Sequence, residues 1–95
     1  MIEFVQDAEG LVCAFEGSLN TAACNEIEAQ VYGKVDEASG AVVFDLSRVD
    51  YVSSGFIRIC LSVHKRAGEG GFKITNPQPA VKRVFMISGL SGLLG

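Results

Sequence analysis

The chain has 95 residues, of which 48% are apolar and 20% are charged, with a formal net charge of −3. This length fits one domain, residues 1–95, and the apolar content is too high for a disordered, charge-rich chain. The acidic balance argues against nucleic acid as a partner, because phosphate binding needs clustered basic residues. No apolar run reaches the roughly 18 residues of a membrane span, and residues 1–7 do not resemble a secretory signal.

The first half of the chain predicts a β-hairpin followed by a helix. Residues 2–6 and 11–16 have strand character, and the segment between them, 7–10, has turn chemistry. Residues 22–38 are expected to form an amphipathic helix, because their apolar residues recur at helical spacing. These apolar residues are Cys24, Ile27, Val31 and Val35.

A central strand is predicted over residues 41–46, an apolar β-branched run. Its lack of alternation is typical of a parallel strand that is buried on both faces. The more polar residues 47–52 are expected to form a loop or a short extended link. Ser53 and Ser54 then offer N-cap side chains for a second helix, which ends near Ala67 before a run of glycines.

The C-terminal part predicts a short strand at 72–75 and a helix at 80–88. Pro79 suits the first helical position and Gly89 suits the position after the helix end. The resulting order, β-β-α-β-α-β-α, indicates a single-domain α/β fold with a mixed sheet of four or five strands. Right-handed crossovers place the three or four helices mainly on one face of that sheet.

Cys13, Cys24 and Cys60 are widely spaced and each has apolar neighbours. This pattern favours three reduced core thiols in a cytoplasmic protein, with a redox-sensing thiol as the alternative. The sequence contains no C-x-x-C pair and no metal-ligand spacing, so we expect neither a metal nor a cofactor.

The sequence offers little for catalysis. Its one histidine, His64, lies on the same predicted helix as Ser54 but roughly 15 Å further along the axis, beyond hydrogen-bond reach. With Lys65 and Arg66, His64 is expected to form a cationic last turn that suits the helix C-terminus. The glycine-rich residues 68–71 follow a helix instead of opening one, which argues against a phosphate-binding loop. We therefore expect a protein that is not an enzyme.

The pair Ser53 and Ser54 has two interpretations. A serine at this point stabilises a helix by roughly 1 kcal/mol as a simple N-cap. A serine here is also a candidate phosphorylation site, where a phosphate adds about −1.5 to −2 charge beside the positive end of the helix dipole. Arg58, one turn later, is either the partner of that phosphate or an ordinary solvated arginine.

Several segments resemble STAS domains, and among them the bacterial anti-sigma factor antagonists. Residues 44–58 are similar to that family's strand, its DLS-x-V segment and its Asp-Ser-Ser/Ala-Gly helix start. Residues 70–71 resemble the Gly-Gly before the next strand, and 79–90 the penultimate helix with its Ser/Thr-Gly-Leu ending. Residues 15–20 resemble the Gly-x-Leu-Asp turn before the first helix. The fold of this family is the one predicted above.

The resemblance implies a partner-switching regulator. In the family, the unphosphorylated antagonist binds an anti-sigma factor that is also a serine kinase, phosphorylation breaks the complex, and a PP2C-like phosphatase resets it. The phosphoacceptor position falls on Ser54, with Ser53 as second choice; a homodimer is also compatible with this family. The implied partner-binding residues are Ser18, Asn20, Arg48, Asp50, Tyr51, Ser53, Ser54, Phe56 and Arg58.

Four departures from the family pattern matter: three substitutions and the C-terminal helix. Ser53 replaces an aspartate, Asn20 replaces another, and Phe56 replaces a glycine, so Phe56 either faces a partner or packs in the core. The C-terminal helix of the family is expected to be absent, with Leu90, Leu93 and Leu94 or another protomer covering the surface. Two alternative functions stay open: a STAS subunit of an ABC-type lipid transport complex, and a STAS domain that senses nucleotides or lipids.

Overall fold

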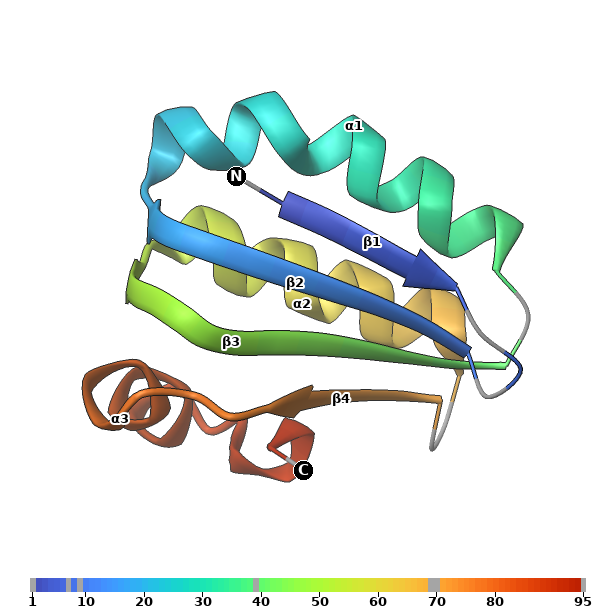
Figure 1. Ribbon diagram of the computed structural model, residues 1–95. Coiled ribbons are helices and arrows are strands. Elements are labelled where there is room, and N and C mark those ends of the chain that lie inside the picture. The colour runs from blue at the N-terminus through green and yellow to red at the C-terminus, as the bar shows by residue number, and fades with distance from the viewer. Residues whose placement is uncertain (1, 7, 9, 39, 69–70, 95) are drawn as a thin grey trace.

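The computed structural model describes residues 2–6, 8, 10–38, 40–68 and 71–94, which contain a four-stranded sheet and three α-helices (Figure 1). The strands lie side by side in chain order, β1 (Ile2–Gln6), β2 (Gly10–Leu19), β3 (Ala41–Val52) and β4 (Phe72–Thr75). β1 is antiparallel to β2, whereas β2, β3 and β4 are parallel. The predicted mixed α/β fold and its element order are confirmed.

Helices α1 (Thr21–Glu37) and α2 (Ser54–Ala67) pack beside each other on one face of the sheet; in Figure 1, α2 lies behind the strands and α1 above them. Helix α3 (Pro79–Ile87) follows β4 and contacts β3, and a short 3₁₀ turn, Ser91–Leu93, follows α3. Among the described residues, no helix is both long and apolar enough to cross a membrane.

One face of the sheet makes the core. Alternate residues of β2 and β3 point toward the helices and are buried, whereas Val43 and Asp45 between them keep partial exposure. The prediction that residues 41–46 are buried on both faces is therefore wrong. β-branched residues suit a half-covered pleated surface as well as a fully covered one, so composition alone did not distinguish the two. These alternating buried residues include Leu11, Cys13 and Phe15 of β2 and Val42, Phe44 and Leu46 of β3.

Four phenylalanines form the centre of the core. The rings of Phe15 and Phe44 meet edge to face at 4.8 Å between centroids, and Phe56 of α2 meets Phe15 at 5.1 Å. Phe72 of β4 packs edge-on against Phe44 at 4.8 Å. Phe56 is fully buried, so its place in the predicted partner surface is wrong, because the aromatic cluster takes the ring that would otherwise face a partner.

Strand β3 extends over residues 47–52, which the sequence predicted as a loop or link. Its register with β2 shifts between Ala14 and Glu16 and again between Gly17 and Ser18. These irregularities break the alternation, so that two pairs of successive residues, 47–48 and 50–51, are exposed although the chain stays in the sheet. Gly17 has φ +90°, a conformation that glycine adopts without strain.

Candidate functional site

The carboxyl ends of β2 and β3 lie at one end of the molecule, where both α1 and α2 begin. The N–H of Ser53 donates to the carbonyl of Leu19 at 3.0 Å, which ties the two strand ends together. Ser18 lies opposite Tyr51 in the strand register. The exposed side chains of Ser18, Tyr51 and Ser54 therefore belong to neighbouring segments at the edge where α/β folds commonly place their sites.

Asn20 begins α1. Its Oδ1 accepts a hydrogen bond from the N–H of Ala23 at 2.9 Å, which satisfies one of the free donors of the first turn. The side chain is nevertheless exposed beside the start of α2. Asn20 thus both caps a helix and contributes to the surface that the sequence analysis assigned to a partner.

The two serines at the start of α2 have opposite environments. Ser53 is the N-cap residue by position, but its side chain makes no cap hydrogen bond and is only 8% exposed. Its Oγ lies 3.7 Å from the Sγ of Cys24, in the interface between α1 and α2. The expectation that Ser53 caps through its hydroxyl is wrong, because the buried thiol of α1 attracts that hydroxyl inward. Ser54 is exposed.

Gly55 lies beside this contact between the helices. A Cβ at that position would lie 3.4 Å from the Ser53 hydroxyl and 3.5 Å from the Cβ of Cys24, which are ordinary contact distances. The start of α2 thus lies against α1, and Ser54 is the serine left on the outer side. Cys24 is a residue of this site that was not predicted from the sequence to lie there.

The N-terminus of α2 is electropositive. Its first turn contains no acidic residue that would balance the helix dipole. One turn later, Arg58 Nη2 lies 3.7 Å from Glu28 Oε2 of α1, so Arg58 is paired as well as largely exposed. Glu28 Oε2 also accepts a hydrogen bond from the Tyr32 hydroxyl at 3.1 Å. The i, i+4 spacing of Glu28 and Tyr32 was the one sequence signal for this arrangement.

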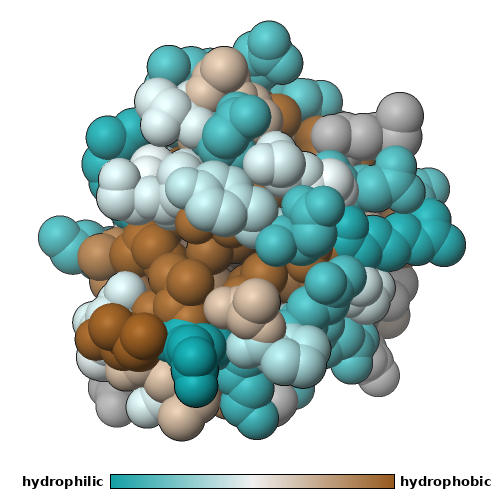
Figure 2. Space-filling model, turned by 90° about the vertical axis from the view of Figure 1, so that its left-hand side faces the viewer, coloured by the Kyte–Doolittle hydropathy of each residue, from teal (hydrophilic) through white to brown (hydrophobic). Residues whose placement is uncertain are grey.

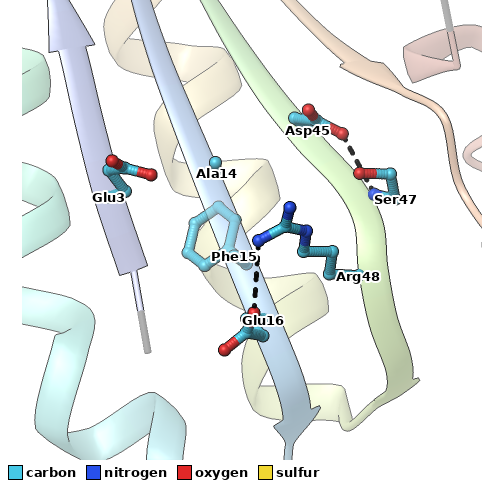
Figure 3. Close-up of a pocket in the computed structure, with 7 residues that line it drawn as sticks. All are labelled: Glu3, Ala14, Phe15, Glu16, Asp45, Ser47 and Arg48. Atoms are coloured by element: carbon cyan, nitrogen blue, oxygen red, sulfur yellow. Dashed lines mark hydrogen bonds and ion pairs between the residues drawn. The ribbon is translucent and has the colours of Figure 1, made fainter.

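Arg48 lies apart from the serines, on the open face of the sheet. Figure 3 shows its guanidinium pointing to Glu16, with Nη1 3.5 Å from Glu16 Oε2. On the same face, the Asp45 carboxylate accepts from the N–H of Ser47 at 3.0 Å. These residues line a shallow cleft of about 300 Å³ together with Glu3, Ala14 and Phe15. Asp50 is exposed near the end of β3.

The cysteines are buried and free. Burial raises the pKa of the Cys13 thiol from 9.0 to about 12. Burial, followed by the neighbouring Cys24, raises the pKa of Cys60 well above 9.0. Cys13 and Cys60 therefore stay protonated at neutral pH and are poor nucleophiles. Among the described residues, no group of His, Cys, Asp and Glu side chains is arranged to hold a metal ion.

His64 lies in the last turn of α2, at the opposite end of the helix from Ser54. Its ring centroid is 6.4 Å from that of Phe72, and its Nδ1 is buried with no hydrogen-bond partner among the described residues. The ring thus packs against the core, and the structure keeps it apart from the serine hydroxyl, as the helical spacing predicts.

Figure 2 views the end of the molecule that carries the start of α2, which is the left-hand side of Figure 1. Apolar residues gather at the centre of this face, and hydrophilic residues surround them. Ile57, in the first turn of α2, is only partly buried. An apolar patch with a polar rim is typical of a protein-binding surface.

A family model described as "Mlab, STAS domain" matches residues 2–95. The chain belongs to the STAS domain family. A Bordetella bronchiseptica protein named as a candidate anti-sigma factor antagonist, BtrV, is 37% identical over 81 residues, covering 83% of this chain and 70% of BtrV.

Solved structures share the fold of this STAS domain. The unphosphorylated anti-sigma factor antagonist SpoIIAA has a TM-score of 0.85 at 20% identity, with 100% of this chain and 86% of SpoIIAA covered. The phosphorylated form of the Bacillus cell fate determinant SpoIIAA has a TM-score of 0.76 at 21% identity, with 100% and 89% covered. A STAS domain protein from Planctomyces limnophilus has a TM-score of 0.82 at 20% identity, with 98% and 85% covered.

Proposed function

We propose that this STAS domain is an anti-sigma factor antagonist whose binding to an anti-sigma factor is controlled by phosphorylation of Ser54. The observation that carries the proposal is the exposed Ser54 at the electropositive start of α2, beside Ser53 whose hydroxyl is buried. The similarity to BtrV supports the general role. The chain then acts as a cytoplasmic regulator and not as an enzyme.

The proposed contact surface is the end of the molecule where β2 and β3 stop. It consists of the exposed side chains around the start of α2, beside the apolar patch of Figure 2. Arg48, on the open sheet face, and Arg58, toward α1, lie at its margins. The central residues are Ser18, Asn20, Asp50, Tyr51 and Ser54.

A phosphate on Ser54 would act on this surface without unfolding it. It would change the net charge from −3 to about −5 and place a hydrated dianion within the contact area. The free N–H groups and the dipole of α2 stabilise that charge. Arg58, one turn away, would bind both the phosphate and Glu28. The helix therefore tolerates a phosphate. A partner packed on this surface would have to remove water from the phosphate, and this cost releases the partner.

The partner of this reaction is expected to be an anti-sigma factor with serine kinase activity, and a PP2C-like phosphatase would remove the phosphate. Neighbouring genes identify candidates for both. Incubation of the chain with that kinase and ATP, followed by mass spectrometry of peptides, tests the acceptor. We expect one phosphate on Ser54, lost in Ser54→Ala and retained in Ser53→Ala; a chain that acquires no phosphate on either serine contradicts the proposal.

Binding provides the second test. Ser54→Asp should weaken the affinity for the anti-sigma factor at least tenfold, because it places a charge in the contact area. Ser47→Asp is the matched control, since Ser47 is an exposed serine on the open sheet face. If Ser54→Asp binds as tightly as Ser47→Asp, the proposed switch is wrong.

The matching family model carries the name Mlab, which favours keeping a second candidate, a STAS subunit of an ABC-type lipid transport complex. In that role the domain would bind a transporter ATPase and would need no phosphate. Co-purification with an ATPase in place of a kinase distinguishes the two functions.

A further inference from the structure

The charges of this chain are separated along the sequence. All eleven acidic residues lie within residues 1–69, and the last of them is Glu69. After residue 70 the charged residues are Lys73, Lys82 and Arg83, all basic. In space, α3 thus forms a basic region on a molecule whose overall charge is −3. This region suits an acidic partner.

Helix α3 has apolar residues on two faces. The inner face packs on the core through Val81 and Phe85, which are buried. A second set of residues lies at spacings i, i+3, i+4, i+7 and i+8, so these residues share the opposite face of the helix. We call this set the outer stripe; it consists of Pro79, Lys82, Arg83, Met86 and Ile87.

The outer stripe is exposed. Ile87 and Met86 are 77% and 56% exposed, more than any other large apolar side chain among the described residues. With the other members of the stripe they line a shallow hollow of about 540 Å³. In the lower part of Figure 2, on the face where α3 lies, strongly apolar and strongly hydrophilic residues occur side by side.

The basic residues of the outer stripe are unpaired within the described part of the chain. Neither Lys82 nor Arg83 forms an ion pair with a described residue, whereas Arg58 and Arg66 of α2 pair with Glu28 and Asp36. The charges of α3 are therefore available to a partner, next to apolar side chains that an ordinary solvated helix does not need.

We propose that the outer stripe is a docking surface for an acidic amphipathic helix of another protein. The partner helix places apolar residues over Met86 and Ile87 and carboxylates against Lys82 and Arg83. Because α3 has nine residues, the contact is about 13 Å long and holds two to three turns of the partner. This surface is additional to the proposed contact around Ser54.

A second copy of the chain is a poorer occupant. The most acidic helix of this molecule is α1, with Glu26, Glu28, Asp36 and Glu37. Among the described residues, none of the exposed large apolar side chains lies on α1. A second copy that places α1 there would supply the charge for Lys82 and Arg83 but no apolar cover for Met86 and Ile87. A second copy that places its own α3 there would supply apolar cover but would bring the like charges of the two helices together.

Fluorescence anisotropy with dye-labelled model peptides tests the proposal on the whole chain. One peptide forms an amphipathic helix with leucines at i, i+3, i+4 and i+7 flanked by glutamates, and its counterpart has lysine in place of each glutamate. We expect the glutamate peptide to bind at least tenfold more tightly than the lysine peptide. The double variant Lys82→Glu/Arg83→Glu should reverse this preference, because it inverts the charge of the stripe.

Ile87→Ser should weaken binding of the glutamate peptide about fivefold, since it removes an apolar contact from an exposed site that the fold does not need. The matched controls are Leu61→Ser and Lys65→Glu, which change an exposed leucine and an exposed lysine of α2 and should leave binding within about twofold. Equal binding of the two peptides, or equal effects of the α2 and α3 variants, overturns the proposal.

Two further measurements exclude the other occupants. Vesicles containing phosphatidylglycerol should not compete with the glutamate peptide, and sedimentation should show no self-association that Ile87→Ser abolishes. Competition by vesicles would assign the stripe to a membrane surface, and such self-association would assign it to a second copy; either result overturns the proposal. None of these assays contains an anti-sigma factor, so they can fail while the function proposed for Ser54 holds. The function proposed for Ser54 can likewise fail while the peptide assays succeed.

Discussion

Helices α2 and α3 both carry basic residues, but they use them differently. Four side chains of α2 are buried, and the guanidinium groups of Arg58 and Arg66 pair with carboxylates of α1. In α3 two side chains are buried, and Lys82 and Arg83 pair with no described residue. Helix α2 is therefore held by ion pairs on its polar side and by buried contacts on its apolar side. The basic residues on the polar side of α3 make no ion pair with a described residue.

The polar side of α2 forms a continuous row of contacts with α1. Arg58 and Tyr32 both reach the carboxylate of Glu28, at 3.7 and 3.1 Å. The guanidinium of Arg66 lies 4.0 Å from the centroid of the Tyr32 ring and pairs with Asp36 at 2.9 Å. These contacts fix the position of α2 beside Ser54, and the switch proposed for Ser54 would require such a rigid support.

The largest expected loss of stability comes from substituting buried residues on the apolar sides of the two helices. Phe56→Ala should lower the free energy of unfolding by roughly 4–5 kcal/mol, because it leaves a cavity beside the rings of Phe15 and Phe44. Phe85→Ala should cost roughly 3 kcal/mol, since Phe85 is equally buried but has no ring contact of this kind among the described residues. Urea unfolding followed by circular dichroism measures both.

If Phe56→Ala is too unstable to purify, Phe56→Leu and Phe85→Leu provide the same comparison at a smaller cost of roughly 1–2 kcal/mol each. The ranking of the two positions is the result that matters. An α3 substitution that costs more than its α2 counterpart would mean that α3 is the better anchored helix.

The apolar contacts and the element order were the easier features to predict from the sequence. Helical spacing predicted the buried face of α1 with Cys24, Val31 and Val35, and the element order predicted the mixed sheet. Phe56, by contrast, was assigned to the partner surface and is buried. The sequence also predicted that His64 is too far from Ser54 for catalysis. These features depend on local spacing, which is a property of each segment by itself.

The polar contacts were harder to predict, because each joins segments far apart in the chain. Ser53 turns inward to Cys24, 29 positions away, and Arg66 reaches Asp36, 30 positions away. Residues 47–52 looked like a loop because register shifts expose successive polar residues of β3. Helical spacing places Val81 and Phe85 on the apolar face of α3 that meets the core, but the sequence did not show that the opposite stripe stays exposed.

The next largest effect concerns pH and the buried thiols, of which Cys60 lies on α2 and none on α3. Their raised pKa values keep Cys13 and Cys60 protonated in the folded chain, whereas unfolded thiols ionise near 9.0. The contribution of these thiols to stability is therefore fully present below about pH 9. It is lost as the pH rises toward the folded pKa, about 12 for Cys13. Each thiol should contribute a loss of about 1.4 kcal/mol per pH unit in this window.

Unfolding free energies measured at several pH values above 9 test this. Cys13→Ala and Cys60→Ala should each reduce the slope, and the double variant should reduce it further. The comparison is between slopes, so the constant cost of the lost side chain cancels. A parent slope that neither substitution changes would show that other groups cause the alkaline loss.

The smallest expected change in stability comes from substitutions on the polar sides of α2 and α3. Arg66→Ala should cost about 1 kcal/mol, because it removes the ion pair with Asp36 and the stacking over Tyr32. Lys82→Ala should change stability by less than about 0.5 kcal/mol, since Lys82 has no ion pair to lose and alanine is a good helix former. High salt should shrink the ionic part of the Arg66 effect and leave the Lys82 result unchanged.

A double-mutant cycle between Arg66 and Asp36 separates the ion pair from the stacking contribution, because Asp36→Ala leaves the Tyr32 ring in place. If Lys82→Ala proves as costly as Arg66→Ala, the cation of α3 is already engaged within the fold and is not available to a partner. If only Arg66 is costly, the positive charge of α3 does nothing for the stability of the domain. That result would leave the charge available to the partner helix proposed above.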